Sequence, residues 1–516
     1  MNAAIIYYSK KALNMQIPLE VLEIIKKLNQ VDFEAYIVGG CVRDIILSKT
    51  KELKRDPKDW DITTNAKPEQ VQKLFPNSIY ENEFGTILIK TSSESPNLKI
   101  IEVTTFRKEG KYSDKRHPDK IEFAETIEED LNRRDFTVNA MAIKPKNTQY
   151  TIQNTEYTLI DPFNGQKDLQ KKLIRAVGNP KERFSEDGLR LMRAIRFACE
   201  LNFQIEPQTL NAIKDNASLL SFISKERIRD ELIKIINSSQ AVKGIFLLQK
   251  NDLLKQIIPE LEKGIGVTQN KHHIYTVWEH AWRSLDYACK KEYSFEVKLA
   301  SLFHDIGKPY TKEGEGINAT FYNHEWQGAK ITARVLSRLK FPKDKAEKII
   351  KLVRYHGFVY DPEITTDAAI RRLLVKIGKE NIQELAQVRE ADRIGSGCPK
   401  ALPFRLRHFL FRVEKVLQEL GGQQPSLKIL KINGNDIIKT LHIESSPKIG
   451  AILSILLEQV LDDSKKNNKK YLEKEAKELS QLSENELKKK QKIAQEKYKN
   501  LLEEKEKEIK KKYYVN

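Results

Sequence analysis

Strand-forming sequence is concentrated in the first 150 residues of the chain and fades after about residue 165. The runs AYIV, WDITT, TILIKT and IIEVTTF are apolar or β-branched, which is typical of strands in one sheet. The segments LEVLEIIKKLN, FSEDGLRLMRAIRFACEL and SKERIRDELIKII instead carry apolar residues at helical spacing. We therefore predict an α+β head, with a mixed sheet and helices, followed by a mostly α-helical remainder.

A chain of 516 residues is too long for one hydrophobic core and should divide into several domains. We predict a head over 1–150, a helical neck over 151–255, a histidine-rich helical block over 265–400, a helical body over 401–463 and a tail over 464–516. In the tail 17 Lys accompany 10 Glu, and Pro and Gly are absent. This composition fits a charged single helix or coiled coil, or a solvated and partly disordered extension without a specific role.

The formal net charge of +18, with a pI near 9.3, indicates a polyanionic partner such as nucleic acid or an anionic membrane, or else a Lys-rich proteome. The four cysteines include no C-x-x-C pair, which argues against disulfides and thiolate zinc sites. No run approaches the roughly 18 apolar residues of a membrane span, and the N-terminal charges follow the apolar patch, unlike those of a signal peptide. These features predict a cytoplasmic protein without a membrane partner.

A pair of carboxylates follows a glycine turn early in the chain. Asp59 and Asp61 stand two residues apart, so on a strand both would face one side and share divalent cations such as Mg²⁺. Gly39 and Gly40 lie between a predicted strand and a predicted helix, where the main chain can approach phosphates, and Arg43 can add a charged contact. Taken alone, D-x-D is more often a surface turn or helix cap. Together, these features are what a nucleotidyl transferase needs.

Arginines recur at helical spacing in the neck. On a helix running from Glu186 to Arg196, the residues Asp187, Arg190 and Arg193 fall near one face. Asp and Arg together offer acceptors and fork-shaped donors that can pair with the edges of cytosine or adenine. A protein side-chain pair would then serve as the template. The alternative is an exposed helix with i, i+3 salt bridges.

Six of the nine histidines lie between residues 270 and 395. His304 and Asp305 stand inside the apolar run LASLFHDIGKP, with His280 before them and Asp392 after them. Such His and Asp side chains can bind a divalent metal and activate water against a phosphate ester. A second metal position would be completed by His324 and His356.

Four segments resemble one family in type, order and spacing over about residues 30–240. GGCVRD with DWDITTNAKPEQV resembles the catalytic head of the polymerase-β-like nucleotidyltransferases, and more specifically the class II (bacterial-type) tRNA nucleotidyltransferase and poly(A) polymerase family. IEEDLNRRDFTVNAMAI is similar to its ribose- and nucleotide-contacting motif, DPFNGQKDLQKKLIRAVGNP to its connector and RFSEDGLRLMRAIRFA to its base-selecting helix. The H…HD…D order resembles the HD phosphohydrolase superfamily.

The resemblance implies an enzyme that adds CCA to the 3′ end of tRNA from CTP and ATP. It implies two Mg²⁺ ions at Asp59 and Asp61, and it assigns the sugar hydroxyls to Asp135 and Asn139, on one face if helical. The nucleotide-binding residues carried over are Gly40, Arg43, Arg134, Asp135, Asn139, Asp187, Arg190, Arg193 and Arg196. The R-R-D triplet would otherwise be a surface ion-pair cluster. Glu102 would be either a third acid near the metals or a structural strand carboxylate.

Several functional alternatives stay open. The charged segment 106–123 has the character of a mobile loop. In the family that the chain resembles, an intact loop here accompanies the switch from C to A addition, so the resemblance implies full CCA addition over CC addition, with A-only addition still possible. Poly(A) polymerases share the same head motifs, and a phosphohydrolase whose head only binds RNA is a third reading. The HD block would hold Mg²⁺ or a divalent transition metal and trim damaged or cyclic phosphate ends of RNA, or it is a degenerate scaffold. The body over 401–463 would bind tRNA.

Overall fold

The computed structural model describes residues 17–48, 57, 59–82, 85–109, 121–145, 157–270, 274–397, 404–420, 426–444, 446–483, 485–487 and 489–490. The chain divides into two compact units, Met1–Pro259 and Glu260–Asn516. Among the described residues no helix combines the length and apolarity that crossing a membrane requires.

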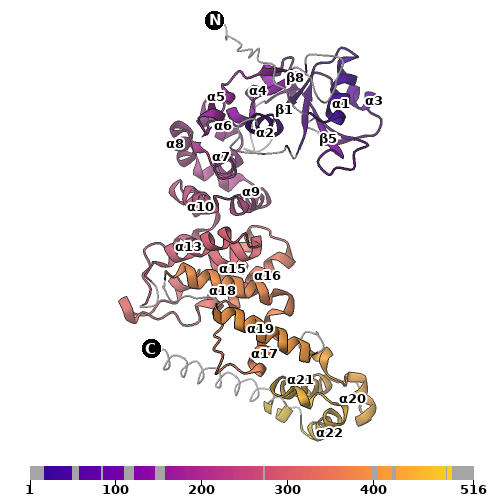
Figure 1. The fold of residues 1–516 in the computed structure, drawn as a ribbon, viewed down its shortest axis with the longest axis vertical. Coiled ribbons are helices and arrows are strands. Elements are labelled where there is room, and N and C mark those ends of the chain that lie inside the picture. Colours follow the sequence, from indigo (N-terminus) through magenta and orange to yellow (C-terminus); the bar gives the residue numbers. More distant parts are fainter. Residues whose placement is uncertain are drawn as a thin grey trace. The chain divides into compact units, whose positions relative to one another are not determined.

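Unit 1 contains a seven-stranded mixed sheet, in which β1, β5 and β8 are labelled in Figure 1. In spatial order the strands are β3 (Ser78–Asn82), β4 (Thr86–Lys90), β5 (Ile100–Thr105), β2 (Asp61–Thr64), β1 (Ala35–Val38), β8 (Ala142–Pro145) and β9 (Tyr157–Ile160). Strands β2 and β5 run parallel, and the other neighbours run antiparallel. All four residues of β1 are buried, as a central strand requires. The predicted mixed sheet is confirmed.

Helices flank this sheet and then continue without it. The helices before residue 150 are α1 (Leu19–Asn29), α2 (Gly40–Ser48), α3 (Pro68–Leu74) and α4 (Ile127–Asn132). Those that follow are α5 (Gly165–Gln170), α6 (Pro180–Glu186), α7 (Leu189–Glu200), α8 (Pro207–Asp215), α9 (Lys225–Asn237), α10 (Ala241–Lys250), α11 (Leu253–Ile257) and α12 (Pro259–Glu262). Ile127 and Leu131 of α4 pack in one apolar cluster with Tyr36 and Val38 of β1. This packing places the R-R-D triplet, which follows α4, beside the central strand.

Two sequence predictions for unit 1 need correction. The boundary at residue 150 is wrong, because β9 pairs with β8 and therefore belongs to the head sheet. The segment 106–123 forms strands at its ends, since β6 (Arg107–Glu109) pairs antiparallel with β7 (Ile121–Phe123). The middle of that predicted loop, 110–120, lies outside the described residues.

Unit 2 is helical in its described parts. The histidine-rich block comprises α13 (Val277–Lys290), α14 (Phe295–Phe303), α15 (His324–Arg338), α16 (Lys343–Tyr355), α17 (Asp367–Ile377) and α18 (Ile382–Gly395). The helices that follow are α19 (Phe404–Glu419), α20 (Gly434–Leu441), α21 (Pro447–Asp462) and α22 (Lys469–Ser480). Thr276 and Glu279 cap α13 reciprocally, which starts the helix one turn before His280.

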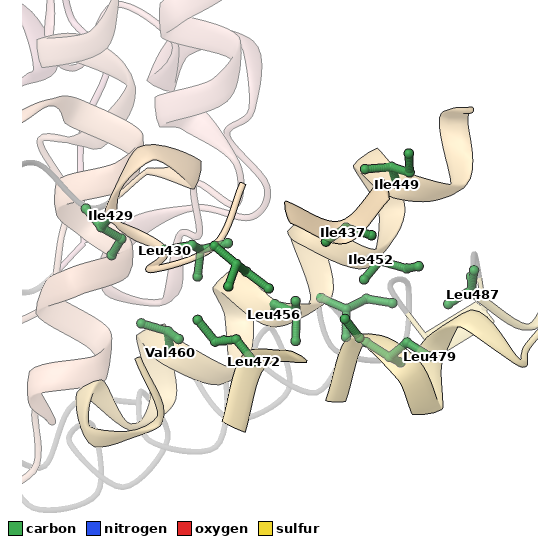
Figure 2. Packing of buried hydrophobic residues seen from close by; sticks show 13 residues of the cluster. Ile429, Leu430, Ile437, Ile449, Ile452, Leu456, Val460, Leu472, Leu479 and Leu487 are labelled. Carbon is green, nitrogen blue, oxygen red and sulfur yellow. The ribbon is translucent and has the colours of Figure 1, made fainter. Parts of the chain in front are cut away.

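The predicted boundary at residue 464 is also wrong. Leu472, Ala476 and Leu479 of α22 are buried in the same apolar cluster as Ile452 and Leu456 of α21 (Figure 2). The charged composition of α22 favours its assignment to the tail. Its three buried residues nevertheless recur at helical spacing among the charged ones and form an apolar face. Residues 491–516, the rest of the predicted tail, lie outside the described part of the chain.

Replacing Leu472 by alanine should therefore destabilise α20–α22. We expect the free energy of unfolding of this region to fall by about 2–5 kcal/mol, because a fully buried leucine leaves a cavity. Hydrogen exchange of the α20–α22 amides measures the loss. The matched control is Lys470→Ala on the same helix, an exposed position where a change within about 0.5 kcal/mol is expected. Equal protection in both variants would contradict the shared core.

Candidate functional site

The turn between β1 and α2 brings the main chain close to the carboxylate of Asp61. Gly39 has a φ of +81°, which residues with a side chain rarely adopt, and α2 begins at Gly40. A Cβ atom on Gly39 would lie 3.0 Å from Asp61 Oδ2 and 3.2 Å from Arg134 Nη1. The glycine therefore leaves room for an acid and an arginine at this corner.

The carboxylates of Asp59, Asp61 and Glu102 are among the acids that line one cleft, which has a volume of about 1330 Å³. Asp61 is the first residue of β2, and Glu102 is its register partner on β5, so both side chains leave the sheet on one face. Asp59 is exposed and precedes β2, so the prediction that both acids of D-x-D lie on a strand is wrong. Burial raises the pKa of Asp61, Arg134 lowers it and Asp59 raises it again. A nearby cation would stabilise the charged form of the Asp61 carboxylate in this setting.

Arg43 is buried one turn into α2 and is held from two sides. Its Nε and Nη2 donate to the carboxylate oxygens of Asp44 at 2.9 and 3.1 Å, and its Nη1 donates to Asn139 Oδ1 at 2.8 Å. The guanidinium also lies 5.3 Å from the centre of the Phe197 ring. The fold thus brings Arg43 and Asn139, two of the predicted nucleotide-binding residues, into contact within the cleft.

The carboxylate of Asp135 is buried and accepts hydrogen bonds on both of its oxygens. It accepts hydrogen bonds from Arg193 Nε at 2.7 Å and from Asn139 Nδ2 at 3.4 Å. Burial raises the pKa of Asp135, but Arg193 and Arg190 lower it more, to about 2. Asn139 ends a 3₁₀ turn, so the segment is not α-helical, but the side chains of Asp135 and Asn139 meet as expected. The alternative of a surface R-R-D cluster is wrong as well, because Asp135 is buried against α7.

The predicted helix from Glu186 to Arg196 is interrupted. Helix α6 ends at Glu186, and Asp187 is extended before α7 begins. The Asp187 carboxylate accepts bonds from Arg227 Nη1 and Nη2 at 3.3 and 2.7 Å. Arg190 ion-pairs with Glu186 and donates to the main-chain oxygen of Arg133 at 3.2 Å. The predicted base-selecting residues therefore line one cleft, but with acidic or main-chain partners.

Four residues of this cleft region escaped sequence reasoning: Asp130, Phe197, Arg227 and Glu231. The Phe197 ring lies 4.2 Å from the Arg196 guanidinium and 5.3 Å from that of Arg193. Arg196 is buried and donates to Glu231 Oε1 at 3.1 Å. Arg227 and Glu231 stand four apart on α9, and no pattern in the sequence indicates that they pair with Asp187 and Arg196.

In unit 2, three histidine rings are oriented in the same way. The Nδ1 atoms of His304, His324 and His356 lie 2.7–2.8 Å from main-chain carbonyl oxygens three residues earlier in the chain. A carbonyl oxygen only accepts, so Nδ1 carries the proton and the Nε2 lone pair of the neutral ring is available to a metal. This is how protein imidazoles are commonly fixed as metal ligands.

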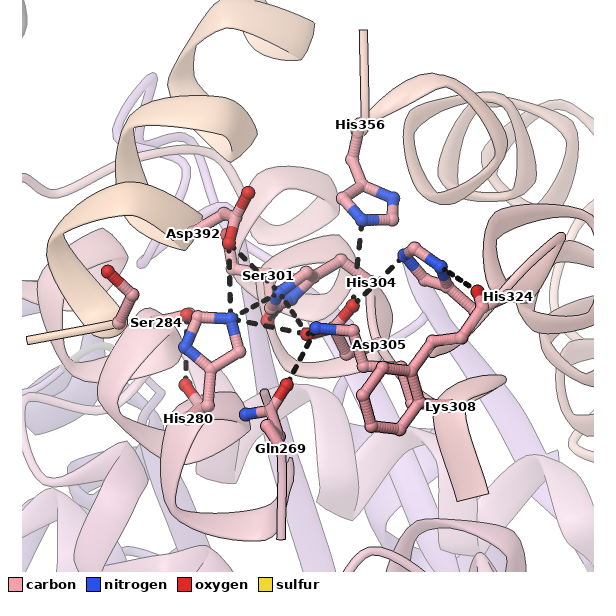
Figure 3. Close-up of polar contacts among 12 residues, drawn as sticks. Gln269, His280, Ser284, Ser301, His304, Asp305, Lys308, His324, His356 and Asp392 are labelled. Carbon is pink, nitrogen blue, oxygen red and sulfur yellow. Dashed lines mark hydrogen bonds and ion pairs between the residues drawn. The ribbon is translucent and has the colours of Figure 1, made fainter. Parts of the chain in front are cut away.

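Asp305 stands between two groups of imidazoles (Figure 3). Its Oδ2 lies 3.3 Å from His280 Nε2 and 3.2 Å from His304 Nε2. Its Oδ1 lies 3.4 Å from His324 Nε2 and 3.7 Å from His356 Nε2. In each group the three ligand atoms lie within 4.8 Å of one another. The fourth predicted ligand joins the first group, since Asp392 Oδ1 lies 3.1 Å from His280 Nε2.

The charges in this cluster favour a cation. Burial lowers the pKa of His304, but Asp305 and Asp392 raise it more, to about 10. Burial lowers the pKa of His324 to about 4, which keeps that ring neutral. Lys308 Nζ lies 2.7 Å from Asp305 Oδ2 and donates to Gln269 Oε1 at 2.7 Å. Imidazole and carboxylate donors suit divalent transition metals, so the residues fit the predicted metal position and a second one beside it.

Comparison with known proteins agrees with this division of the chain. The model described as the poly A polymerase head domain matches residues 35–175, and the one described as the probable RNA and SrmB-binding site of polymerase A matches 202–265. The model of the HD domain matches residues 277–396. The fold and the cleft thus define a nucleotidyltransferase head joined to an HD domain, and domains of these two kinds use divalent metals.

Individual relatives show which nucleotidyltransferases this chain is similar to. A CCA-adding enzyme of Limosilactobacillus reuteri is 44% identical over 223 residues, which are 43% of this chain and 50% of the relative. One of Ligilactobacillus salivarius is 40% identical over 237 residues, 46% of this chain and 54% of the relative. The crystal structure of the Bacillus stearothermophilus CCA-adding enzyme in complex with CTP is 27% identical, with a TM-score of 0.64 over 90% of this chain and 97% of that one.

The chain therefore carries a poly A polymerase head domain, a probable RNA-binding site of polymerase A and an HD domain, and it is similar to CCA-adding enzymes. It spans about half the length of the curated relatives that it matches.

The two faces of Asp305 predict the metal content of the HD domain. We expect purified protein dialysed against Mn²⁺ to lose one bound ion on His356→Ala and two on Asp305→Ala, because Asp305 is the one described residue that belongs to both groups. Metal analysis by mass spectrometry gives the stoichiometry. His408→Ala is the control, since that histidine is hydrogen-bonded to Tyr360 outside the cluster. Equal metal loss in His356→Ala and Asp305→Ala would contradict two positions bridged by one carboxylate.

Proposed function

We propose that unit 1 adds CCA to the 3′ end of tRNA, using CTP and ATP and two Mg²⁺ ions held by Asp59 and Asp61. The observation that carries the proposal is the placement of Asp61, Glu102 and Asp59 in one cleft against the corner at Gly39. The names of the relatives from Limosilactobacillus reuteri and Ligilactobacillus salivarius, and the CTP bound to the Bacillus stearothermophilus enzyme, support the reaction and the substrates.

The side chains around the acids would have separate roles in binding the nucleotide. Bound Mg²⁺ ions would lower the pKa of the attacking 3′ hydroxyl and neutralise charge on the triphosphate. Gly40, at the start of α2, and Arg43 would bind phosphate oxygens, with Arg134 contacting the nucleotide from the opposite side of the corner. The bond from Arg43 to Asn139 ties phosphate binding to the sugar position, which Asn139 and Asp135 would read.

Base selection is proposed for the cleft face that contains Asp187, Arg190, Arg193 and Arg196. Asp187 can serve without releasing Arg227, because a carboxylate offers about four lone-pair sites, of which Arg227 uses two and the main-chain N–H of Leu189 a third. Arg193 is locked to Asp135, so it links the sugar position to the base position. Arg196 is buried and donates a hydrogen bond to Glu231, and this bond would hold Arg196 in place on this face of the cleft.

Substitution of the acids tests the proposal. The variant Asp59→Ala/Asp61→Ala should lose about a thousandfold or more of its nucleotide incorporation into a tRNA that lacks its last three nucleotides, because metal binding is lost. Asp215→Ala, an exposed acid ion-paired with Lys181, is the control with unchanged incorporation. Retained incorporation in the double variant would defeat the metal assignment.

Sequencing the product ends separates the related activities. With CTP and ATP together, CCA addition stops after three nucleotides, A-only addition requires an end in CC, and a poly(A) polymerase gives long adenosine tracts. An RNA-binding head without transfer activity would give no extension.

We propose a second activity for the HD domain, namely metal-dependent hydrolysis of phosphate esters at RNA ends. The observation that favours it is the convergence of four imidazole Nε2 atoms on Asp305 and Asp392. A divalent ion bound there would activate a water molecule. Water attacks phosphorus, the phosphorus–oxygen bond breaks and the leaving oxygen takes a proton. Removal of a 3′ phosphate in this way would leave the hydroxyl that nucleotidyl transfer needs.

The two activities should be separable by mutation. Asp305→Ala should abolish Mn²⁺-dependent hydrolysis of a 2′,3′-cyclic nucleotide while leaving nucleotide incorporation within about twofold, because the two sites lie in different units. Opening of the cyclic nucleotide to its phosphomonoester and extension of tRNA are measured on the same preparation, with His408→Ala as the control. Hydrolysis that survives Asp305→Ala removes this site as its source, and a wild-type protein without hydrolysis leaves the domain as a scaffold.

A further inference from the structure

Asp130 is a fully buried acid beside the head cleft that has no place in the proposed chemistry. It lies on α4, and its side chain is 0% exposed. Its Oδ1 accepts from Arg133 Nε at 2.9 Å and from the main-chain N–H of Arg107 at 3.4 Å. Its Oδ2 ion-pairs with Arg134 Nη2 at 3.3 Å. One carboxylate therefore joins α4, strand β6 and both arginines of the R-R-D triplet.

Arg134 stands between this buried acid and the proposed metal ligand. Its Nη1 and the Oδ2 of Asp61 both lie within 3.2 Å of the point that a Cβ atom on Gly39 would occupy. The Arg134 guanidinium can therefore pair with either of two acids, Asp130 or Asp61.

The choice matters because a guanidinium and a metal ion compete for one carboxylate. An arginine that pairs with Asp61 occupies the oxygens that a divalent cation needs. Asp130 is buried and has partners on three sides, so it can bind Arg134 without offering a cation site. It thereby holds the guanidinium at the cleft wall.

We propose that Asp130 is a positioning residue that keeps Arg134 from pairing with Asp61 and so leaves Asp61 open to a divalent cation. The inference rests on the proposed function of Asp61 as a metal ligand. Within the segment EEDLNRRD, Asp130 would then have a role distinct from the roles of Arg133, Arg134 and Asp135.

Metal affinity tests this role directly. In an Asp305→Ala background, which removes the HD site, Asp130→Asn should raise the Kd of the head for Mn²⁺ by about fivefold, because Arg134 turns to Asp61. Electron paramagnetic resonance of free Mn²⁺ gives the Kd without any turnover. Thermal unfolding checks the fold, and Asp130→Ser, which also removes the charge, replaces the Asn variant if that does not fold.

A second substitution separates positioning from general damage. Arg134→Gln added to Asp130→Asn should return the Kd for Mn²⁺ to within about twofold of the background, since the competing guanidinium is gone. Asp168→Asn is the matched control: this buried acid holds Arg175 and Thr137 outside the cleft, and its loss should cost stability but not metal affinity.

The outcomes distinguish this inference from the proposed function. A folded Asp130→Asn variant with unchanged Mn²⁺ affinity, or a loss of affinity that Arg134→Gln does not reverse, would overturn the positioning role. Mn²⁺ binding that survives Asp59→Ala/Asp61→Ala would instead overturn the metal assignment on which the role rests.

Discussion

The register between β1 and β2 is the constraint on which the head site depends. Val38, the last residue of β1, pairs with Asp61, the first residue of β2, and Gly39 follows at once. A slip of one residue would turn Asp61 to the other face of the sheet and remove it from the corner. The same register, continued to β5, places Glu102 beside Asp61. The register of the sheet therefore fixes the positions of both the acids and the glycine corner.

Around this corner, charge is balanced pair by pair. The cleft is lined by many arginines, and a buried guanidinium is costly unless an acid accompanies it. Arg193 has Asp135, Arg196 has Glu231 and Asp187 has Arg227. Each pair joins α7 or the turn before it to another part of unit 1. The partners thus hold the arginines in fixed directions while the cleft keeps a net preference for an anionic ligand.

The HD cluster uses a different device, in which the main chain orients the ligands. Three rings donate from Nδ1 to the carbonyl three residues earlier, so each histidine is fixed by its own turn of backbone. The Nε2 atoms then meet at Asp305, which contacts both groups. Such a site needs few residues beyond its ligands, because local geometry supplies most of the orientation.

Sequence alone determined the motifs, the α+β head and the histidine-rich block, because these depend on local periodicity and on residue types at short spacing. It predicted His280, Asp305 and Asp392 as metal ligands and Asp61 beside the glycine corner, and the structure places the side chains of each set near one another. Tertiary structure decided the partners. The pairing of Asp187 with Arg227, the burial of Asp130 and the burial of Leu472 arise from contacts between elements distant in sequence. No local pattern specifies such contacts, because they depend on how separately formed elements pack.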